Sequence, residues 1–397
     1  MFRNIMVTQE QPLPGLHRRL VVCCDGTWNA DDAGPSATNV VRMLRCIAPQ
    51  AEDGTPQIVH YHPGVGTGDP LDHMLGGALG IGLAPAIRDT YAFLANNYAP
   101  GDEIFLFGFS RGAFTARSVA GLIGAIGLLH AREMGRFMDA WRWSQLPKTQ
   151  RDLAALDRCF PLRARDVPIR CIGVWDTVGA LGVPRNRVLK NWHPCAETYR
   201  FYDTSLGSHV RYAFQALAID ERREPFAPAL WNTTRDPAPD QMIRQVWFAG
   251  VHADVGGGYA DHGPADIPFV WMLAQVDPLL ALDLNAIPPE LDTTEPYDRG
   301  GLHESFEGPL WKWAGEKRRT VGPGASQYVH ETVLERFGYR GYPTNPDFDF
   351  KALPVWRRDS FERDFAWSQA APPPPSPSLP GRKPSLCGKV VGWLEGS

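Results

Sequence analysis

The chain has 397 residues, of which 44% are hydrophobic and 21% are charged. This composition is typical of globular proteins and excludes collagen-like and intrinsically disordered chains. Because 44 acidic residues outnumber 40 Lys and Arg, we also expect no nucleic-acid-binding protein, which would need a basic surface.

The first twenty residues contain Pro12, Pro14 and several charges where a secretory signal would carry an apolar stretch. We therefore expect the protein to be cytoplasmic at synthesis, with export by a non-Sec route still open. The most apolar stretch, residues 74–87, is too short and too rich in glycine to cross a bilayer. Seven cysteines without a Cys-x-x-Cys pair argue against a disulfide framework or a zinc knuckle.

Short apolar runs rich in β-branched residues recur along the chain, and most of them lead into Gly or Asp, as buried parallel strands do. These runs cover residues 20–24, 58–61, 104–107, 169–175 and 246–251. Segments of helical character lie between and after them, at residues 39–47, 86–97, 112–129, 209–217 and 267–275. The alternation predicts an α/β fold of the α/β-hydrolase type, with a doubly wound, mostly parallel sheet and helices on both faces.

Beyond residue 277 the alternation weakens, and we expect one further helix at residues 328–337. We interpret residues 19–364 as one catalytic domain, of which residues 286–364 are an extension packed on the core. Residues 1–18 form an N-terminal extension in this interpretation. Residues 365–397 are expected to be a disordered tail, because they contain the linker-like string APPPPSPSLPG.

The strongest local signal is the string IFLFGFSRGA at residues 104–113, in which an apolar strand runs through Gly-x-Ser-x-Gly into a helix of small residues. This is the context of a nucleophile elbow, a sharp turn that exposes the serine hydroxyl. Gly108 and Gly112 are needed there because side chains at those positions would collide with the neighbouring strand and helix. We predict Ser110 as a nucleophile. The alternative is a glycine-rich turn without a catalytic role.

A serine hydroxyl needs a base to take its proton, and the base needs an orienting carboxylate. Asp176 and His252 stand at the ends of the last two predicted strands, and the carboxyl ends of parallel strands meet at one edge of a sheet. The chain order Ser110, Asp176, His252 is the order found in α/β-hydrolases. We predict these three residues as a catalytic triad.

Other residues could take two of these roles. Asp220 and Asp254 also follow Ser110 and are alternative acids, although such residues more often cap a turn or pair with an arginine. The alternative bases are placed less well: His60, His62 and His73 precede the serine, and His130 and His209 lie in expected helical segments.

The tetrahedral intermediate of acyl transfer needs two N–H donors. One is expected from the amide of Arg111, directly after the nucleophile. The other is expected from the loop after the first strand, at Gly26 or Thr27, because Gly26 permits close approach of the backbone. The alternative is a plain turn in which Asp25 or Thr27 caps a helix.

Three further patterns suggest chemistries that the sequence does not support. The string CCDGT at residues 23–27 is similar to a phosphatase loop, but Cys23 replaces the aspartyl nucleophile. The glycine-rich segment 63–68 lacks the Lys-Ser/Thr of a phosphate-binding loop, and we expect a flexible loop near the site. His60 and His62 face one side of a strand without a clustered carboxylate, so we expect a packed pair, no metal and no other cofactor.

Several strings together resemble the catalytic domain of the type VI secretion phospholipase effectors, a family of α/β-hydrolase-fold proteins with bacterial and fungal members. In chain order they are DGTWN at residues 25–29, YHPGVGT at 61–67, GDEIFLFGFSRGA at 101–113, VWDTV at 174–178, AIDE at 218–221 and VHADVGGGY at 251–259. The resemblance covers roughly residues 19–350. It implies Ser110 as nucleophile, Asp176 as acid and His252 as base.

We therefore expect a lipolytic serine carboxyl-ester hydrolase that acts on an ester or phospholipid through an acyl-enzyme, with transient contact to a membrane surface. Two alternatives stay open. One is a catalytically silent module that binds a partner through the Pro-rich tail. The other is hydrolysis of a different acyl bond, such as a thioester, amide or polyester. The apolar segment 74–84 is expected to be either a lid or a buried helix entry.

Overall fold

The computed structural model places most of the predicted catalytic domain. It describes residues 17–26, 36–64, 83–179, 206–231, 238–286, 301–308, 311–312, 315–322, 326–340 and 345–362. The expected N-terminal extension up to residue 16 and the Pro-rich tail lie outside the described residues, as do residues 65–68 of the expected flexible loop and residues 74–82 of the segment expected to be a lid or a buried helix entry.

An eight-stranded parallel sheet organises the described part of the chain. Its order is β2-β1-β3-β4-β5-β6-β7-β8, and every neighbouring pair is parallel. The strands are β1 (Arg19–Cys24), β2 (Gln57–His62), β3 (Glu103–Phe109), β4 (Ile169–Trp175), β5 (Val210–Ala218), β6 (Met242–Phe248), β7 (Gln327–His330) and β8 (Val355–Trp356). The predicted α/β class with a parallel sheet is confirmed.

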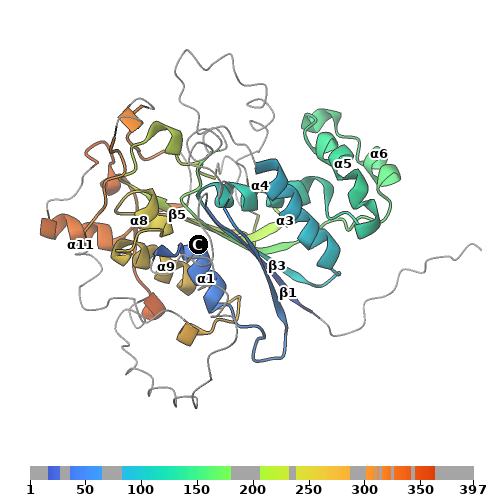
Figure 1. Ribbon diagram of the computed structural model, residues 1–397, viewed down its shortest axis with the longest axis horizontal. Helices are drawn as coiled ribbons and strands as arrows, with labels where there is room; N and C mark the ends of the chain where they lie inside the picture. Colours follow the sequence, from blue (N-terminus) through green and yellow to red (C-terminus); the bar gives the residue numbers. More distant parts are fainter. Residues whose placement is uncertain are drawn as a thin grey trace, which may run out of the picture.

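Helices cover both faces of this sheet (Figure 1), and two separate hydrophobic clusters fill the spaces beneath them. One face carries α3 (Leu83–Asn97), α4 (Ser110–Ile126), α5 (Phe137–Ser144) and α6 (Leu153–Cys159). The other face carries α1 (Asn39–Cys46) and α9 (Gly263–Val276). Alternate residues of β1 show the division, because Leu20 and Val22 belong to the first cluster and Val21 and Cys23 to the second.

Shorter helices complete the described part. The α-helices are α8 (His252–Gly256), which follows β6, and α11 (Glu331–Arg340), which follows β7 directly. A 3-10 helix of two turns lies at Ala131–Arg136, and single turns of 3-10 helix occur at Lys148–Gln150, Glu224–Phe226, Leu284–Ala286 and Phe350–Ala352. None of the described helices is long and apolar enough to cross a membrane.

The helix expected at residues 209–217 is wrong, because this segment is the central strand β5. It lies between β4 and β6, and it is buried on both faces from Ala213 to Ala218. A strand without an exposed face shows no alternation of polar and apolar residues, so its pattern cannot be told from that of a buried helix. The helix expected at residues 328–337 is wrong in its first turn, which is β7.

The sheet reverses its direction of growth between β1 and β3. From β1 the chain passes through α1 to β2 on one side, and from β3 it passes through α4 to β4 on the other side. The helices that follow β1 and β3 therefore lie on opposite faces, which opens a crevice at the carboxyl ends of these two strands. Such switch points are where open α/β sheets bind ligands.

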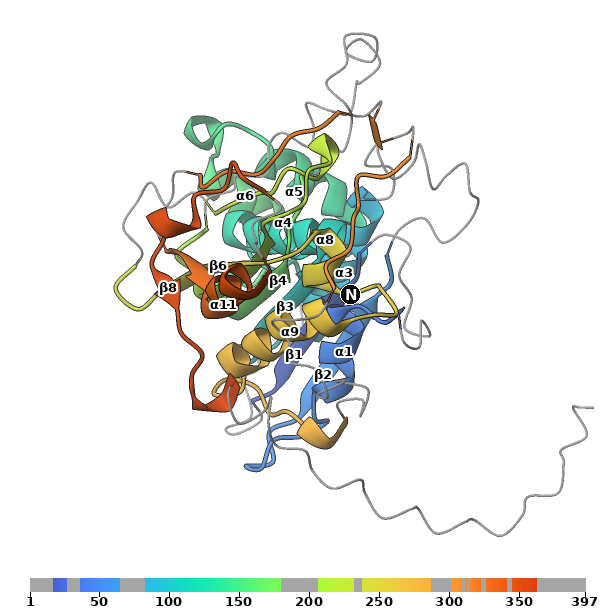
Figure 2. The ribbon, with the colours of Figure 1, turned by 90° about the vertical axis from the view of Figure 1, so that its left-hand side faces the viewer.

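Residues beyond the alternating core extend the same sheet. β7 pairs with β6, and β8 pairs with β7. A third hydrophobic cluster joins this edge to the core through Trp247 of β6 and Phe348, with ring centroids 4.9 Å apart. In Figure 2 the orange trace of residues 301–308 runs beside α8, so this extension reaches the carboxyl edge of the sheet.

Candidate active site

Ser110 lies at the turn from β3 into α4, as the Gly-x-Ser-x-Gly string predicts. Its φ is +58°, in the left-handed region that non-glycine residues seldom adopt. The preceding residue, Phe109, is still extended, so the backbone reverses sharply at the serine. Such strain is typical of residues that the surrounding structure holds in place for function.

The two glycines around Ser110 are required by close packing. A Cβ on Gly108 would lie 2.6 Å from the carbonyl oxygen of Gly112. A Cβ on Gly112 would lie 2.2 Å from the carbonyl oxygen of Cys24 and 2.4 Å from that of Asp25. The first turn of α4 therefore packs directly on the end of β1, which brings the serine to the switch point.

Asp176 and His252 meet at the same edge of the sheet. Asp176 follows β4, His252 is the first residue of α8 after β6, and the imidazole Nδ1 donates to Oδ2 of the carboxylate over 2.5 Å. Both side chains are buried. Asp176 has a φ of +39°, so the backbone is strained at this residue as well.

The second ring nitrogen of His252 is left for another partner. Nε2 is buried and makes no hydrogen bond within the described part of the chain. The imidazole lies between two aromatic rings, Phe109 at 4.6 Å and Phe226 at 4.9 Å between ring centroids. Burial lowers the pKa of His252, although the Asp176 carboxylate acts in the opposite direction. The imidazole is thus held neutral and oriented, as a general base must be.

The two rival acids make other contacts. Asp220 accepts a hydrogen bond from the Gly250 amide at 2.6 Å. Asp254 accepts from the Val251 amide at 3.0 Å and from the His303 ring at 2.6 Å. The carboxylate of Asp220 thus orders the turn before α8, and that of Asp254 orders the same turn and orients the ring of His303.

The rival bases in the described part make other contacts, although His62 lines the pocket described below. His60 stacks on Phe93, and His62 Nδ1 contacts the carbonyl of Pro63. His130 caps a 3-10 helix, and His209 stands directly before β5 with Nε2 2.9 Å from the carbonyl oxygen of Ala120. The expected helical setting of His209 is wrong for the same reason as the helix at 209–217. His73 lies outside the described residues.

An arginine that the sequence analysis did not single out completes the surroundings of Asp176. Arg319 donates from both terminal nitrogens, to Oδ1 at 2.6 Å and to Oδ2 at 2.8 Å. The Ala218 amide adds a hydrogen bond to Oδ1 at 3.0 Å. Burial alone would raise the pKa of Asp176, but the Arg319 charge and the bonds to Arg319 and His252 outweigh burial and hold it well below its usual range.

A second buried carboxylate supports the backbone of His252. Glu221 Oε2 accepts from the His252 amide at 3.3 Å, and the same carboxylate accepts from the Ser305 hydroxyl and from Arg223. Burial opposes ionisation, but the bonds and charge of Arg223 outweigh it and lower the pKa of Glu221 to about 2. Sequence reasoning assigned no role to Glu221, Arg223 or Ser305, although Glu221 ends the family string at residues 218–221.

Two of the three residues expected to supply oxyanion donors, Arg111 and Gly26, lie at the switch point. The amide of Arg111 belongs to the first turn of α4, where N–H groups point out of the helix end. The amide of Gly26 donates to its neighbour Asp25 at 2.6 Å, so it is engaged in this conformation. Thr27 lies outside the described residues.

Asp25 is not an ordinary helix cap. Its carboxylate accepts from the hydroxyls of Thr38 and Tyr61, each at 2.9 Å, besides the Gly26 amide. Burial raises the pKa of Asp25 to about 6, against the lowering effect of these bonds. The Thr38 hydroxyl in turn caps α1 by accepting from the Val41 amide. Asp25 therefore ties the loop after β1 to both β2 and α1.

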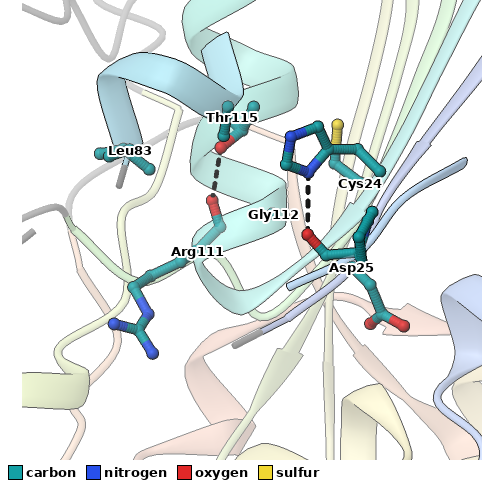
Figure 3. Close-up of a pocket in the computed structure, with 9 residues that line it drawn as sticks. Cys24, Asp25, Leu83, Arg111, Gly112 and Thr115 are labelled. Carbon is teal, nitrogen blue, oxygen red and sulfur yellow. Dashed lines mark hydrogen bonds between the residues drawn. The ribbon is translucent and has the colours of Figure 1, made fainter. Parts of the chain in front are cut away.

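Figure 3 shows the pocket at this switch point, between the end of β1, the start of α3 and the first turns of α4. It is lined by Cys24, Asp25, His62, Pro63, Leu83, Ala86, Arg111, Gly112 and Thr115. Arg111, an expected oxyanion donor, and Asp25, which directly precedes Gly26, thus line the same pocket. Within the described ranges no group of three His, Cys, Asp or Glu side chains is placed to hold a metal ion.

Comparisons with known proteins agree with the resemblance seen in the sequence strings. Over 233 residues, 53% of this chain, the sequence is 28% identical to the uncharacterized protein YEL023C of Saccharomyces cerevisiae. The chain spans about a third, 32%, of that relative's length.

Two solved structures are similar at low identity. One is a crystal structure of an uncharacterized protein from Pseudomonas aeruginosa, with 16% identity, a TM-score of 0.40 and coverage of 67% of this chain and 46% of that one. The other is the Tle1 effector bound to the VgrG spike from the type 6 secretion system, with 20% identity, a TM-score of 0.33 and coverage of 63% and 52%.

A family model described as "T6SS, Phospholipase effector Tle1-like, catalytic domain" matches residues 18–275, which is more than half of the chain. These residues run from β1 into the last turn of α9 and contain Ser110, Asp176 and His252. The chain therefore belongs to the Tle1-like catalytic-domain family of phospholipase effectors.

Proposed function

We propose that this protein is a serine carboxyl-ester hydrolase of the lipolytic type, with Ser110 as nucleophile, His252 as base and Asp176 as the orienting acid. The observation that carries the proposal is the 2.5 Å contact between His252 Nδ1 and Asp176 at the edge where Ser110 occupies a strained turn. The rival acids, by contrast, have other partners.

The reaction divides into two acyl transfers. His252 Nε2 takes the proton of the Ser110 hydroxyl, and the oxygen attacks the ester carbonyl to give a tetrahedral intermediate. The intermediate collapses when the protonated imidazole gives its proton to the departing alkoxide, which leaves as an alcohol. Water, deprotonated by the same imidazole, then attacks the acyl-serine and releases a carboxylic acid and free Ser110.

Hydrogen-bond donors determine the role of each group in this reaction. Asp176 stays ionised because four donors surround its two oxygens, and it stabilises the imidazolium that forms in each step. The amide of Arg111 is proposed as one oxyanion donor, since it follows the nucleophile at a helix N-terminus. The loop at Gly26 and Thr27 is proposed as the second, with the Gly26 amide turning from Asp25 to the substrate.

The substrate class follows from the family. The matching model is that of a phospholipase effector, so we propose a phospholipid ester as substrate, reached by transient contact with a membrane surface. Export by a non-Sec route belongs to the same proposal, since the family is named for the type VI secretion system.

Active-site labelling tests the proposal. Wild-type protein, Ser110→Ala and the matched control Ser118→Ala, a buried serine on the same helix, are treated with a fluorophosphonate and analysed by intact mass and peptide mapping. We expect one adduct, on Ser110, in the wild type and the control and none in Ser110→Ala. The same three proteins are then assayed on phosphatidylcholine and phosphatidylglycerol vesicles for release of fatty acid.

The outcomes separate the alternatives. Labelling of Ser110 without fatty-acid release, but with turnover of thioester, amide or polyester substrates, would support the triad and show that the substrate is a different acyl compound. A folded wild type that is not labelled, in buffer or with micelles present, would instead favour a silent module. In that case truncation at residue 370 should abolish the biological role while Ser110→Ala leaves it intact.

A further inference from the structure

Arg319 stands outside the family match, yet it makes the most extensive contacts with the proposed acid. Its two terminal nitrogens donate to the two oxygens of Asp176 at 2.6 and 2.8 Å, in the parallel geometry of a bidentate pair. Its side chain is 2% exposed and that of Asp176 is fully buried. The matched region ends at residue 275, so this contact comes from the extension.

The guanidinium is held from two sides by backbone carbonyls. One terminal nitrogen also donates to Ala218 at the end of β5, over 2.7 Å, and the other to Phe226, over 2.8 Å. The Asn345 side chain donates to the carbonyl of Arg319 itself at 2.9 Å. Arg319 is thus held by four hydrogen bonds from its terminal nitrogens and by one bond to its carbonyl.

We propose that Arg319 is a positioning residue for the hydrolase, which holds the Asp176 carboxylate for His252 and moderates the basicity of the dyad. The proposal rests on the proposed function, because it requires Asp176 to act on His252 during catalysis.

Geometry supports the positioning role. Asp176 must present Oδ2 to His252 while its backbone is strained at φ +39°. The fork of Arg319 bonds both carboxylate oxygens and the Ala218 amide bonds Oδ1, and together these bonds fix the plane of the carboxylate. A lysine could supply a charge at this place but only one point of contact, so the two roles of the arginine can be separated.

Electrostatics support the moderating role. The charged groups that face His252 are Asp176 and Glu221, which favour the imidazolium, and Arg223, which disfavours it. Arg319 compensates the charge of Asp176, so its loss leaves a stronger negative field on the imidazole. The imidazolium is then favoured, and the base becomes protonated at higher pH than in the wild type.

The test measures the rate at which a fluorophosphonate labels Ser110, as a function of pH, in the full-length protein. This readout depends on the state of His252 and needs no knowledge of the natural ester. For Arg319→Gln we expect the pH at which the labelling rate falls on the acidic side to rise by about one pH unit; this fall is the acidic limb of the pH profile. We also expect the plateau rate to fall on the order of 10²-fold, because the dyad is misplaced. Arg318→Gln changes a half-buried neighbour that pairs with Glu316; it is the matched control and should match the wild type.

Arg319→Lys keeps the positive charge and removes the bidentate contact, so it separates the two roles of the arginine. It also provides the test if Arg319→Gln does not fold. We expect its acidic limb to stay at the wild-type position, since the charge remains, and its plateau to fall because the fork is lost. A shifted limb in Arg319→Lys, or an unchanged plateau, would overturn the proposal. So would a folded Arg319→Gln with wild-type limb and plateau. An unlabelled wild type would instead refute the proposed function, so the two failures are distinguishable.

Discussion

The ring of Phe109 lies against the imidazole of His252, with ring centroids 4.6 Å apart. Phe109 directly precedes Ser110, so one side chain links the turn that carries the nucleophile to the helix that carries the base. A Cβ on Gly256, at the other end of α8, would lie 1.9 Å from the same ring. The approach of α8 to the end of β3 therefore depends on this contact.

The acid can be identified by comparing three carboxylates. Asp176→Asn should lower kcat on the order of 10⁴-fold, because the amide cannot stabilise the imidazolium or hold the required tautomer. Asp220→Asn and Asp254→Asn should lower kcat far less, since those carboxylates contact backbone amides and His303. Steady-state hydrolysis of a soluble ester measures all three. A severe loss in Asp254→Asn with near-normal activity in Asp176→Asn, both folded, would show that the acid has been assigned wrongly.

The strained backbone at Ser110 should lower the stability of the folded protein by a measurable amount. A non-glycine residue in the left-handed region is destabilised by about 1–3 kcal/mol, a cost that glycine does not bear. Ser110→Gly should therefore unfold at a higher temperature than Ser110→Ala, although both lose the hydroxyl and both should be inactive. Thermal denaturation of the two variants gives the difference directly. Equal or reversed stabilities would mean that the turn is relaxed in solution.

Close packing of α4 on β1 can be tested with two glycines of the same helix. Gly112→Ala places a methyl group 2.2 Å from a β1 carbonyl oxygen, so we expect a loss of about 2–5 kcal/mol or failure to fold. Gly121→Ala meets nothing within 4 Å and should gain about 0.5–1 kcal/mol from helix propensity. Urea denaturation measures both. A Gly112→Ala protein as stable as the wild type would contradict the described contact.

The pH dependence of kcat/KM should reflect a buried base. The imidazole acts only when neutral, and burial lowers the pKa of His252 from its ordinary 6.5, so activity should persist below that pH and fall as the ring becomes protonated. Asp25, whose pKa is raised to about 6, could titrate in the same range. The pH profile of Asp25→Asn is the control. If the acidic limb is unchanged in this variant, it reflects the protonation of His252. A wild-type limb above pH 6.5 would mean that Asp176 outweighs burial.

Sequence reasoning reached the fold class and the contact between Asp176 and His252 because both follow from local patterns. Apolar runs that end in Asp or Gly mark strand ends, and parallel strand ends meet at one edge. It missed Val210–Ala218 as a strand, since full burial removes the polar alternation that identifies strands. It also missed Arg319, because the partner of a buried arginine is set by the docking of a distant segment. Three consecutive basic residues, Lys317, Arg318 and Arg319, are typical of a solvent-exposed segment.

The position of Arg319 in the chain also affects how the protein is made. A ribosome delivers Ser110, Asp176 and His252 before it delivers the arginine. Until residues 315–322 dock on the ends of β4 and β5, the Asp176 carboxylate lacks the guanidinium that compensates it in the folded protein. A buried carboxylate without that counter-ion is costly, so the nascent chain leaves this edge of the sheet open to water. Completion of the proposed catalytic centre is thus deferred until residues 315–322 have left the exit tunnel.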